Sequence, residues 1–222
     1  MEQYYYDLHV HTCEVSRCAV SPAEDIAEYI ASIGYAGFVV TDHFFNGNCG
    51  VDNSLPWEEK VTRYISGYEK AKKRGKELGI DVFFGWEYSA DGDYITLGLS
   101  PEWLYAHPDV DKMKLTDYFD LVHEEGGYLI HAHPFLSDVH VRLYPGYEDA
   151  VEVINAGKPD FANNTARWYA ESYGLCKVGG SDMHCVNRPR TSGVALPRRA
   201  ADIGDLISML RAGEHTVLDL KH

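Results

Sequence analysis

The sequence predicts an α/β protein whose strands and helices alternate and whose sheet closes, or nearly closes, into a barrel. Apolar runs of strand length alternate with amphipathic helical segments along the 222 residues, which is the pattern of a parallel sheet covered by helices. There are enough of these runs for a barrel, and most are followed by polar residues, which a barrel gathers at one rim. The length suits a single domain over residues 1–222.

The net charge and the cysteine content limit the partners and the environment. A formal charge of −14 repels nucleic-acid backbones and anionic membrane surfaces, so an anionic substrate would need local cations at its site. The sequence has no apolar run of about 18 residues that could span a bilayer, and residues 1–20 do not resemble a signal peptide. The five cysteines are spread without a Cys-x-x-Cys pair. We therefore expect free thiols in a reducing, cytoplasmic environment.

The first strand is expected over residues 4–12 and carries two histidines near its carboxyl end. Side chains of a strand alternate between its faces, so Asp7, His9 and His11 point to the same side. Two converging imidazoles make half of a metal site, although an isolated pair is equally consistent with hydrogen-bonded histidines in a core. Similar residues at the ends of later strands favour the metal site.

A strand–helix–strand unit follows. Residues 21–33 are predicted to form a helix because they open on Ser-Pro-Ala-Glu and end before a glycine. Residues 37–41 form an apolar strand that ends in Asp42 and His43. The loop over 44–57 is rich in glycine and asparagine, which makes it a candidate cover for a substrate.

The remaining elements continue the alternation. Residues 58–78 are expected to form one helix, whose lysines and arginines make a solvated face balanced by glutamates rather than a nucleic-acid site. Further strands are expected at 80–87, 94–99, 128–134, 151–155, 176–178, 193–196 and 216–220, and further helices at 115–124, 159–173 and 202–210.

Metal-binding residue types recur at the carboxyl ends of the strands. Imidazole and carboxylate together favour Zn, Mn or Fe over Ca or Mg, and the lack of cysteine at these positions argues against a closed structural zinc site. Cys13, Cys18 and Cys185 lie beside them, but histidines and carboxylates already fill the obvious positions. The set is larger than one ion can use, which indicates a multinuclear catalytic centre: His9, His11, His43, Glu87, His131, His133, Asp182 and His184.

The order of these motifs resembles that of the PHP (polymerase and histidinol phosphatase) superfamily. His-x-His-Thr is followed by Thr-Asp-His, an isolated Glu after a strand, His-Pro and Gly-Ser-Asp-x-His, between positions 7 and 184. Any one motif is weak, but five in this order make chance a poor explanation. The resemblance implies a distorted seven-stranded β/α barrel, with two to three metal ions at the carboxyl-terminal rim and phosphoester hydrolysis as the usual chemistry.

The resemblance also implies which residues hold each ion. His9, His11, Glu87 and Asp182 would hold the first, Glu87 would bridge to a second that His133 also binds, and His43 and His184 would hold the third. His131 either adds a ligand or hydrogen-bonds to one. The sequence departs from the family at two points. Glu14 is the nearest candidate for the usual His or Asp of the third ion, and residues 94–96 offer no His for the second.

Such a centre would hydrolyse a phosphate ester with a metal-activated hydroxide. Asp182 or the neighbouring His184 would protonate the leaving group, with Glu87 holding two ions together. Arg188 and Arg190 are placed to fork onto the phosphate, although an exposed loop explains them equally well. Weaker candidates for substrate contact are Lys177, Asn155 and His140.

The leading functional hypothesis is therefore a metal-dependent phosphatase or phosphodiesterase that acts on a small phosphorylated metabolite. Histidinol phosphate is one substrate that the resemblance suggests, and no residue selects it. One alternative is a 3′–5′ exonuclease, against which the acidic composition argues. Another is a metal-binding regulatory module without catalysis, which the incomplete third site keeps open.

Overall fold

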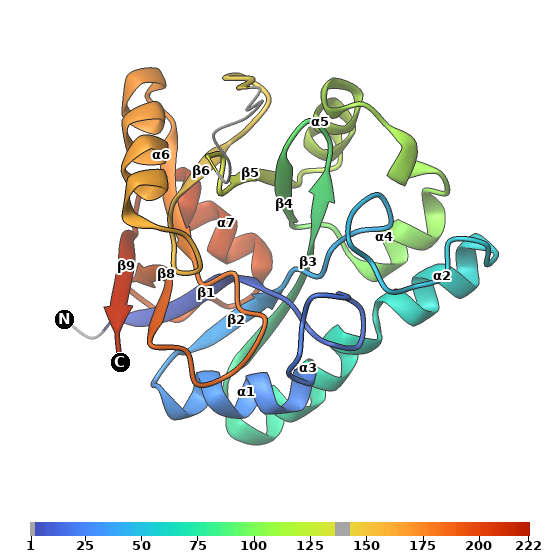
Figure 1. Ribbon diagram of the computed structural model, residues 1–222, viewed down its shortest axis with the longest axis horizontal. Coiled ribbons are helices and arrows are strands. Elements are labelled where there is room, and N and C mark those ends of the chain that lie inside the picture. The colour runs from blue at the N-terminus through green and yellow to red at the C-terminus, as the bar shows by residue number, and fades with distance from the viewer. Residues whose placement is uncertain (1–2, 136–142) are drawn as a thin grey trace.

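The computed structural model describes residues 3–135 and 143–222, whose elements alternate as the sequence predicts (Figure 1). The strands form one sheet in the order β7-β6-β5-β4-β3-β2-β1-β8-β9. Their bounds are β1 (Tyr4–Val10), β2 (Gly37–Val40), β3 (Asp81–Ser89), β4 (Asp93–Leu97), β5 (Tyr128–Ala132), β6 (Ala150–Asn155), β7 (Cys176–Gly180), β8 (Arg190–Leu196) and β9 (Thr216–Lys221). The helices are α1 (Ala23–Ser32), α2 (Trp57–Tyr64), α3 (Ser66–Leu78), α4 (Pro101–Ala106), α5 (Leu115–Glu124), α6 (Asp160–Tyr173) and α7 (Ile203–Arg211), with a short 3-10 helix at Val110–Lys112.

Strands β1 to β7 make a nearly closed, barrel-shaped sheet, which confirms the predicted barrel. The chain beyond β7 runs beside β1, where the Met183 amide donates to the His9 carbonyl at 3.2 Å and the His11 amide donates to the Met183 carbonyl at 2.9 Å. Strand β8 pairs with the outer edge of β1, and β9 pairs with β8. Helices α1, α3 and α6 lie around the outside of the sheet in Figure 1.

The expected parallel sheet is antiparallel at β4, at β8 and at β9. Strand β4 is antiparallel to β3 and to β5, and β8 is antiparallel to β1 and to β9. The reason lies in the connection between β3 and β4, where Ser89 pairs with Asp93 across a tight turn. A parallel pair needs a crossover of a dozen or more residues, and this turn is far too short for one.

Apolar residues fill the barrel at the end opposite to the predicted site. One buried cluster joins Leu8 of β1, Ile95 of β4 and Ile130 of β5 to Leu206 and Ile207 of α7. Arg211, at the end of α7, donates to the Gly127 carbonyl at 2.9 Å, immediately before β5 begins. Helix α7 therefore closes the amino-terminal end of the parallel strands and leaves their carboxyl ends for polar side chains.

The helix expected over 58–78 is two helices, α2 and α3, which meet at Ile65. The first turn of α3 approaches the loops that follow β1 and β2. A Cβ atom on Gly67 would lie 2.2 Å from Thr12 Oγ1 and 3.1 Å from Asp42 Oδ2. Only a glycine fits this close approach, and the change of direction at Ile65 brings α3 against the site.

The loop over 44–57, expected as a substrate cover, is anchored in the core at its start. Phe44 and Phe45 are buried, and their rings contact Tyr64, Trp86 and Trp57. Burial of two aromatic rings ties this part of the loop to the scaffold.

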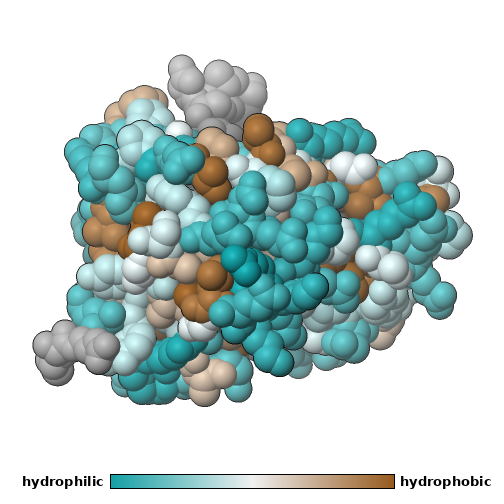
Figure 2. All heavy atoms as spheres, turned by 90° about the horizontal axis from the view of Figure 1, so that it is seen from below, coloured by the Kyte–Doolittle hydropathy of each residue, from teal (hydrophilic) through white to brown (hydrophobic). Residues whose placement is uncertain are grey.

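The face of the molecule in Figure 2 is mainly hydrophilic and shows small, separated apolar patches among polar residues, in line with the acidic composition. Within residues 3–135 and 143–222, no helix combines the length and the apolar character needed to cross a bilayer. The cysteines are free thiols, as expected.

Candidate metal centre

The barrel brings most of the predicted ligands together at the carboxyl ends of its strands. Ligand atoms lie within 4.8 Å of one another in four overlapping groups. These are His9–His11–Glu87, His9–His133–Asp182, His11–His43–His184 and Glu87–Asp93–His133.

The two histidines of the first strand point at the same spot, as their spacing predicts. Their Nε2 atoms are only 3.0 Å apart, and both rings are fully buried. Asp182 Oδ1 lies 3.6 Å from His9 Nε2 and 3.3 Å from His11 Nε2. Glu87 Oε1 lies 3.3 Å from His9 Nε2, and its Oε2 lies 3.7 Å from His11 Nε2. Separations of this size suit nitrogen and oxygen atoms that share one cation at about 2.0–2.2 Å.

Glu87 lies at the centre of the cluster and faces ligands on both of its oxygens. Its Oε1 is 3.1 Å from His133 Nε2, and its Oε2 is 2.6 Å from His43 Nδ1. The angle of this second contact does not suit a hydrogen bond, so Oε2 and Nδ1 are buried without hydrogen-bond partners among the described residues. Unpartnered buried polar atoms are costly. A cation between them would remove that cost, so these residues fit a metal ion.

The charges of the cluster also suit cations. Burial alone would raise the pKa of Glu87, but the charge of His9 and a hydrogen bond from His133 hold the pKa well below its usual value. The pKa of Asp182 is likewise held low against burial by the charge of His9 and a hydrogen bond from His11. Both carboxylates are therefore ionised and attract positive charge.

A carboxylate outside the cluster orients two of its histidines. Glu152 of β6 lies 2.9 Å from His9 Nδ1 through its Oε1, and its Oε2 accepts from the His133 amide at 2.9 Å. The first contact fixes the proton of His9 on Nδ1 and leaves Nε2 free to bind metal. Sequence reasoning missed Glu152, although a lone carboxylate inside an apolar strand was a usable signal.

Asp93 offers a ligand atom at the position that the sequence left open for the second ion. It is the first residue of β4, and its carboxylate joins Glu87 and His133 in one group. The Ser89 hydroxyl donates to its Oδ1 at 2.7 Å. Sequence reasoning assigned Asp93 to a turn, and only the pairing of β3 with β4 directs it toward Glu87.

Two predicted metal ligands lie elsewhere. His131 contacts Glu148 Oε2 through Nδ1 at 2.6 Å and stacks on Tyr94. It shares no face with His133, because β5 ends at Ala132 and His133 adopts a left-handed φ of 29° that turns its ring into the site. Glu14 accepts from the Ala23 amide at 3.1 Å and pairs with Lys70, so it caps the start of α1 and lies outside the four groups of ligand atoms.

The predicted substrate contacts divide in the same way. Asn155 donates to Asp182 Oδ2 at 3.3 Å and so belongs to the site. Arg188 Nη2 and Asp182 Oδ2 both lie within 4 Å of the point where a Cβ on Gly157 would stand, which places this guanidinium near Asp182. His140 falls outside the described residues.

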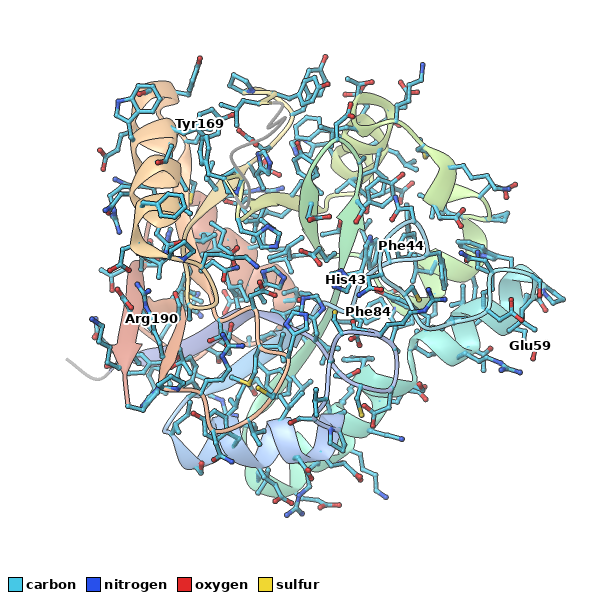
Figure 3. The ribbon with its side chains drawn as sticks, viewed as in Figure 1. His43, Phe44, Glu59, Phe84, Tyr169 and Arg190 are labelled. Carbon is cyan, nitrogen blue, oxygen red and sulfur yellow. The ribbon has the colours of Figure 1, made fainter. Side chains whose placement is uncertain are left out.

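Arg190 and Lys177 are not at the site. Arg190 binds Asp219 through two nitrogens and Asp160 through a third, and Figure 3 shows it well away from His43. Lys177 pairs with Glu171 near the start of β7, whereas the ligands follow the end of that strand.

Sequence reasoning also missed a cation beside Asp182. Lys158, in the loop after β6, lies 2.8 Å from Asp182 Oδ2 and is 19% exposed. Asp182 Oδ1 faces His9 and His11, whereas Oδ2, which Lys158 contacts, also lies 4.0 Å from His133 Nε2. Lys158 therefore adds positive charge beside the cluster without occupying it.

Comparison with known proteins identifies the fold. No protein-family model and no curated protein matches the sequence. Among solved structures, a two-domain protein of Bacteroides vulgatus containing a predicted PHP-like metal-dependent phosphoesterase aligns over 98% of this chain, with a TM-score of 0.72 and 15% identity. This chain has a PHP-like fold. It spans 65% of that longer protein.

Two further structures share the PHP-like fold. A protein of Bifidobacterium adolescentis named as a metal-dependent phosphoesterase aligns over 84% of this chain and 90% of its own, with a TM-score of 0.58 and 15% identity. An amidohydrolase of Chromobacterium violaceum with bound sulfate aligns over 81% of this chain and 87% of its own, with a TM-score of 0.59 and 16% identity. At these identities the likeness concerns the fold, and the chemistry must be argued from the site.

Proposed function

We propose that this protein is a metal-dependent hydrolase that cleaves phosphate esters of small molecules at a multinuclear centre. The observation that carries the proposal is the position of Glu87, whose two oxygens face different histidines in overlapping groups of ligand atoms. A carboxylate in this position can bridge two ions. Paired ions in such a site would neutralise phosphate oxygens and lower the pKa of a coordinated water.

The residues around the cluster suit an anionic substrate. Lys158 contacts Asp182 and Arg188 lies near it, in a chain whose net charge is −14. Two cations beside the cluster would attract a phosphate, whereas a neutral competitor gains no such attraction. This supports a phosphate ester over an amide as the substrate.

The three residues proposed as catalytic have different tasks. Glu87 would bridge two ions. Asp182, whose pKa is lowered, would be a ligand rather than a proton donor. His184, whose side chain is 24% exposed and lies 3.4 Å from Asp182 Oδ1, would bind an ion at the solvent-exposed side of the cluster.

The test combines metal analysis with substrate screening. Protein purified without chelators should carry two to three Zn, Mn or Fe ions per chain and hydrolyse phosphomonoesters faster than single-stranded oligonucleotides. Glu87→Ala should lose metal and slow turnover by at least about 100-fold, since even residues that only orient ligands cost 10- to 100-fold. Glu77→Ala is the matched control, because Glu77 is exposed and pairs only with Arg74 on the same helix. A metal-loaded protein that cleaves no phosphate ester, or a fully active Glu87→Ala variant, would contradict the proposal.

A further inference from the structure

The ligand group of His11, His43 and His184 has a sulfur atom beside it. Cys18 Sγ lies 3.2 Å from His43 Nε2 and 3.0 Å from His184 Nε2. These two histidines follow different strands, and Cys18 lies in the loop after β1. The thiol is therefore in contact with both imidazoles at the position where Glu14 was expected.

The loop that carries Cys18 is fixed on both sides. The Arg17 amide donates to the Asn48 carbonyl at 3.1 Å, and the Val20 amide donates to the His184 carbonyl at 2.7 Å. The second bond ties the loop directly to the segment that carries one of the two histidines. The backbone on both sides of Cys18 is thus held in place, and on one side it is held against His184.

The proton of one of these imidazoles can be assigned. The Nδ1 atom of His184 lies 2.9 Å from the Asp182 carbonyl, which can only accept, so the proton of this ring is on Nδ1 and Nε2 presents a lone pair to Cys18. Without an ion, the thiol can donate to His184 Nε2 and accept from His43 Nε2. Two imidazole nitrogens and a sulfur that can each offer a lone pair are also the donor set of a metal site.

We propose that Cys18 is a thiolate ligand of the third metal ion, together with His43 and His184. In a tetrahedral site with a metal–sulfur distance of about 2.3 Å and a metal–nitrogen distance of about 2.0–2.1 Å, sulfur and nitrogen are roughly 3.5 Å apart. The observed S···N distances of 3.0 and 3.2 Å are a few tenths of an ångström shorter than this. Glu87 Oε2, fully buried and without a hydrogen-bond partner among the described residues, faces His43 from the other side.

The ligand type has a consequence for the choice of metal. Thiolate is a soft ligand that favours Zn or Fe over Mn and Mg. The third position therefore selects a softer ion than a site built only from histidine and carboxylate. The inference rests on the multinuclear centre proposed above, and it adds a selectivity that the other ligand groups do not provide.

Cobalt substitution tests the inference directly. Apoprotein reloaded with Co²⁺ should show a thiolate-to-cobalt charge-transfer band in the near ultraviolet. Cys18→Ser and Cys18→Ala should lose this band and bind about one ion fewer per chain. Cys13→Ser is the matched control, because Cys13 lies in the same loop and contacts Glu14 instead of a histidine. It should keep both the band and the ion.

The outcomes separate this inference from the proposed function. A wild-type protein that hydrolyses phosphate esters but shows no sulfur band overturns the role of Cys18 and leaves the function in place. A sulfur band that disappears in Cys18→Ser supports the role of Cys18, whether or not the loaded protein cleaves an ester. A band that survives in Cys18→Ser assigns the sulfur ligand to another cysteine and overturns the inference. Circular dichroism of the variants checks that they fold, as expected for an exposed side chain.

Discussion

Replacing Glu152 by glutamine should weaken metal binding although Glu152 is not itself in the ligand cluster. Its Oε2 accepts hydrogen bonds from the His133 amide and from Asn155 Nδ2, both at 2.9 Å. In Glu152→Gln the amide oxygen must take this position to keep those bonds. The NH₂ group then faces His9 Nδ1, which Glu152 Oε1 contacts at 2.9 Å in the native protein.

The substitution therefore reverses the tautomer of His9. An NH₂ group donates, so Nδ1 must accept and the ring proton moves to Nε2, the atom that faces His11 and Glu87. A metal ion must then displace that proton. Loss of a group that orients a ligand typically reduces metal affinity 10- to 100-fold, and we expect the upper end, about 2.7 kcal/mol.

The effect should depend on pH. Although burial lowers the pKa of His9, the charges of Glu152, Asp182 and Glu87 raise it well above its ordinary value. Below that raised pKa, metal binding to the native protein must expel a proton, so its affinity falls as the pH falls. In Glu152→Gln the charge of Glu152 is absent, so the pKa of His9 is lower and protons compete less strongly with the metal ion for this ring. The gap between native and variant affinities should therefore narrow toward acidic pH.

Competition titrations with a chromophoric chelator measure the affinities. Glu148→Gln is the matched control, because Glu148 contacts His131 Nδ1 in the same way, at 2.6 Å, and His131 lies outside the cluster. Its metal affinity should be unchanged. Equal affinities for native protein and Glu152→Gln across the pH range would refute the reasoning, and a loss in Glu148→Gln would restore His131 as a ligand.

Three further perturbations test other parts of the site. Asp93→Asn should reduce the metal content by about one ion per chain, because the group of Glu87, Asp93 and His133 loses a charged ligand. An unchanged metal content in elemental analysis would exclude Asp93 as a ligand. Lys158→Ala should raise KM for a phosphomonoester about tenfold or more and leave the metal content unchanged, as expected for loss of a charge-assisted bond. Steady-state kinetics and elemental analysis measure the two quantities, and an unchanged KM would contradict the prediction. Asp7→Asn should gain stability relative to the native protein as the pH rises. Burial raises the pKa of Asp7 from 3.8 to about 7, so its stabilising protonated form is fully present below pH ~4 and is lost as the pH rises through about 7. The relative gain, up to roughly 4 kcal/mol, is measurable by urea unfolding of metal-free protein at pH 4 and pH 8, and a constant difference would contradict the prediction.

The sequence by itself determined the barrel and most of the candidate metal ligands. Hydrophobic runs and helix boundaries depend on neighbouring residues, so they can be recognised along one chain. His9, His11, His43 and Glu87 could be placed because they follow or end clear strands, and the ends of neighbouring parallel strands meet at one rim. The rule that alternate residues of a strand share a face correctly paired His9 of β1 with His11, which follows that strand.

The same rule failed for His131 and His133, because it holds only while the strand continues. The backbone at His133 leaves the strand with a positive φ, and no local pattern shows this turn. Sequence spacing also cannot tell which far residues face each other. Asp93 reached the cluster through an antiparallel hairpin, and Glu152 met His9 across 143 positions of sequence.

Only the tertiary structure decided which of several plausible side chains lie at the site. Glu14 and Cys18 are both close in sequence to the first motif, yet one caps a helix and the other contacts two ligand histidines. Arg190 and Lys158 are both cations near strand ends, yet only Lys158 reaches Asp182. The physical reason is that ligand geometry depends on distances of a few ångströms between separate loops, and those distances are set by packing of the whole barrel.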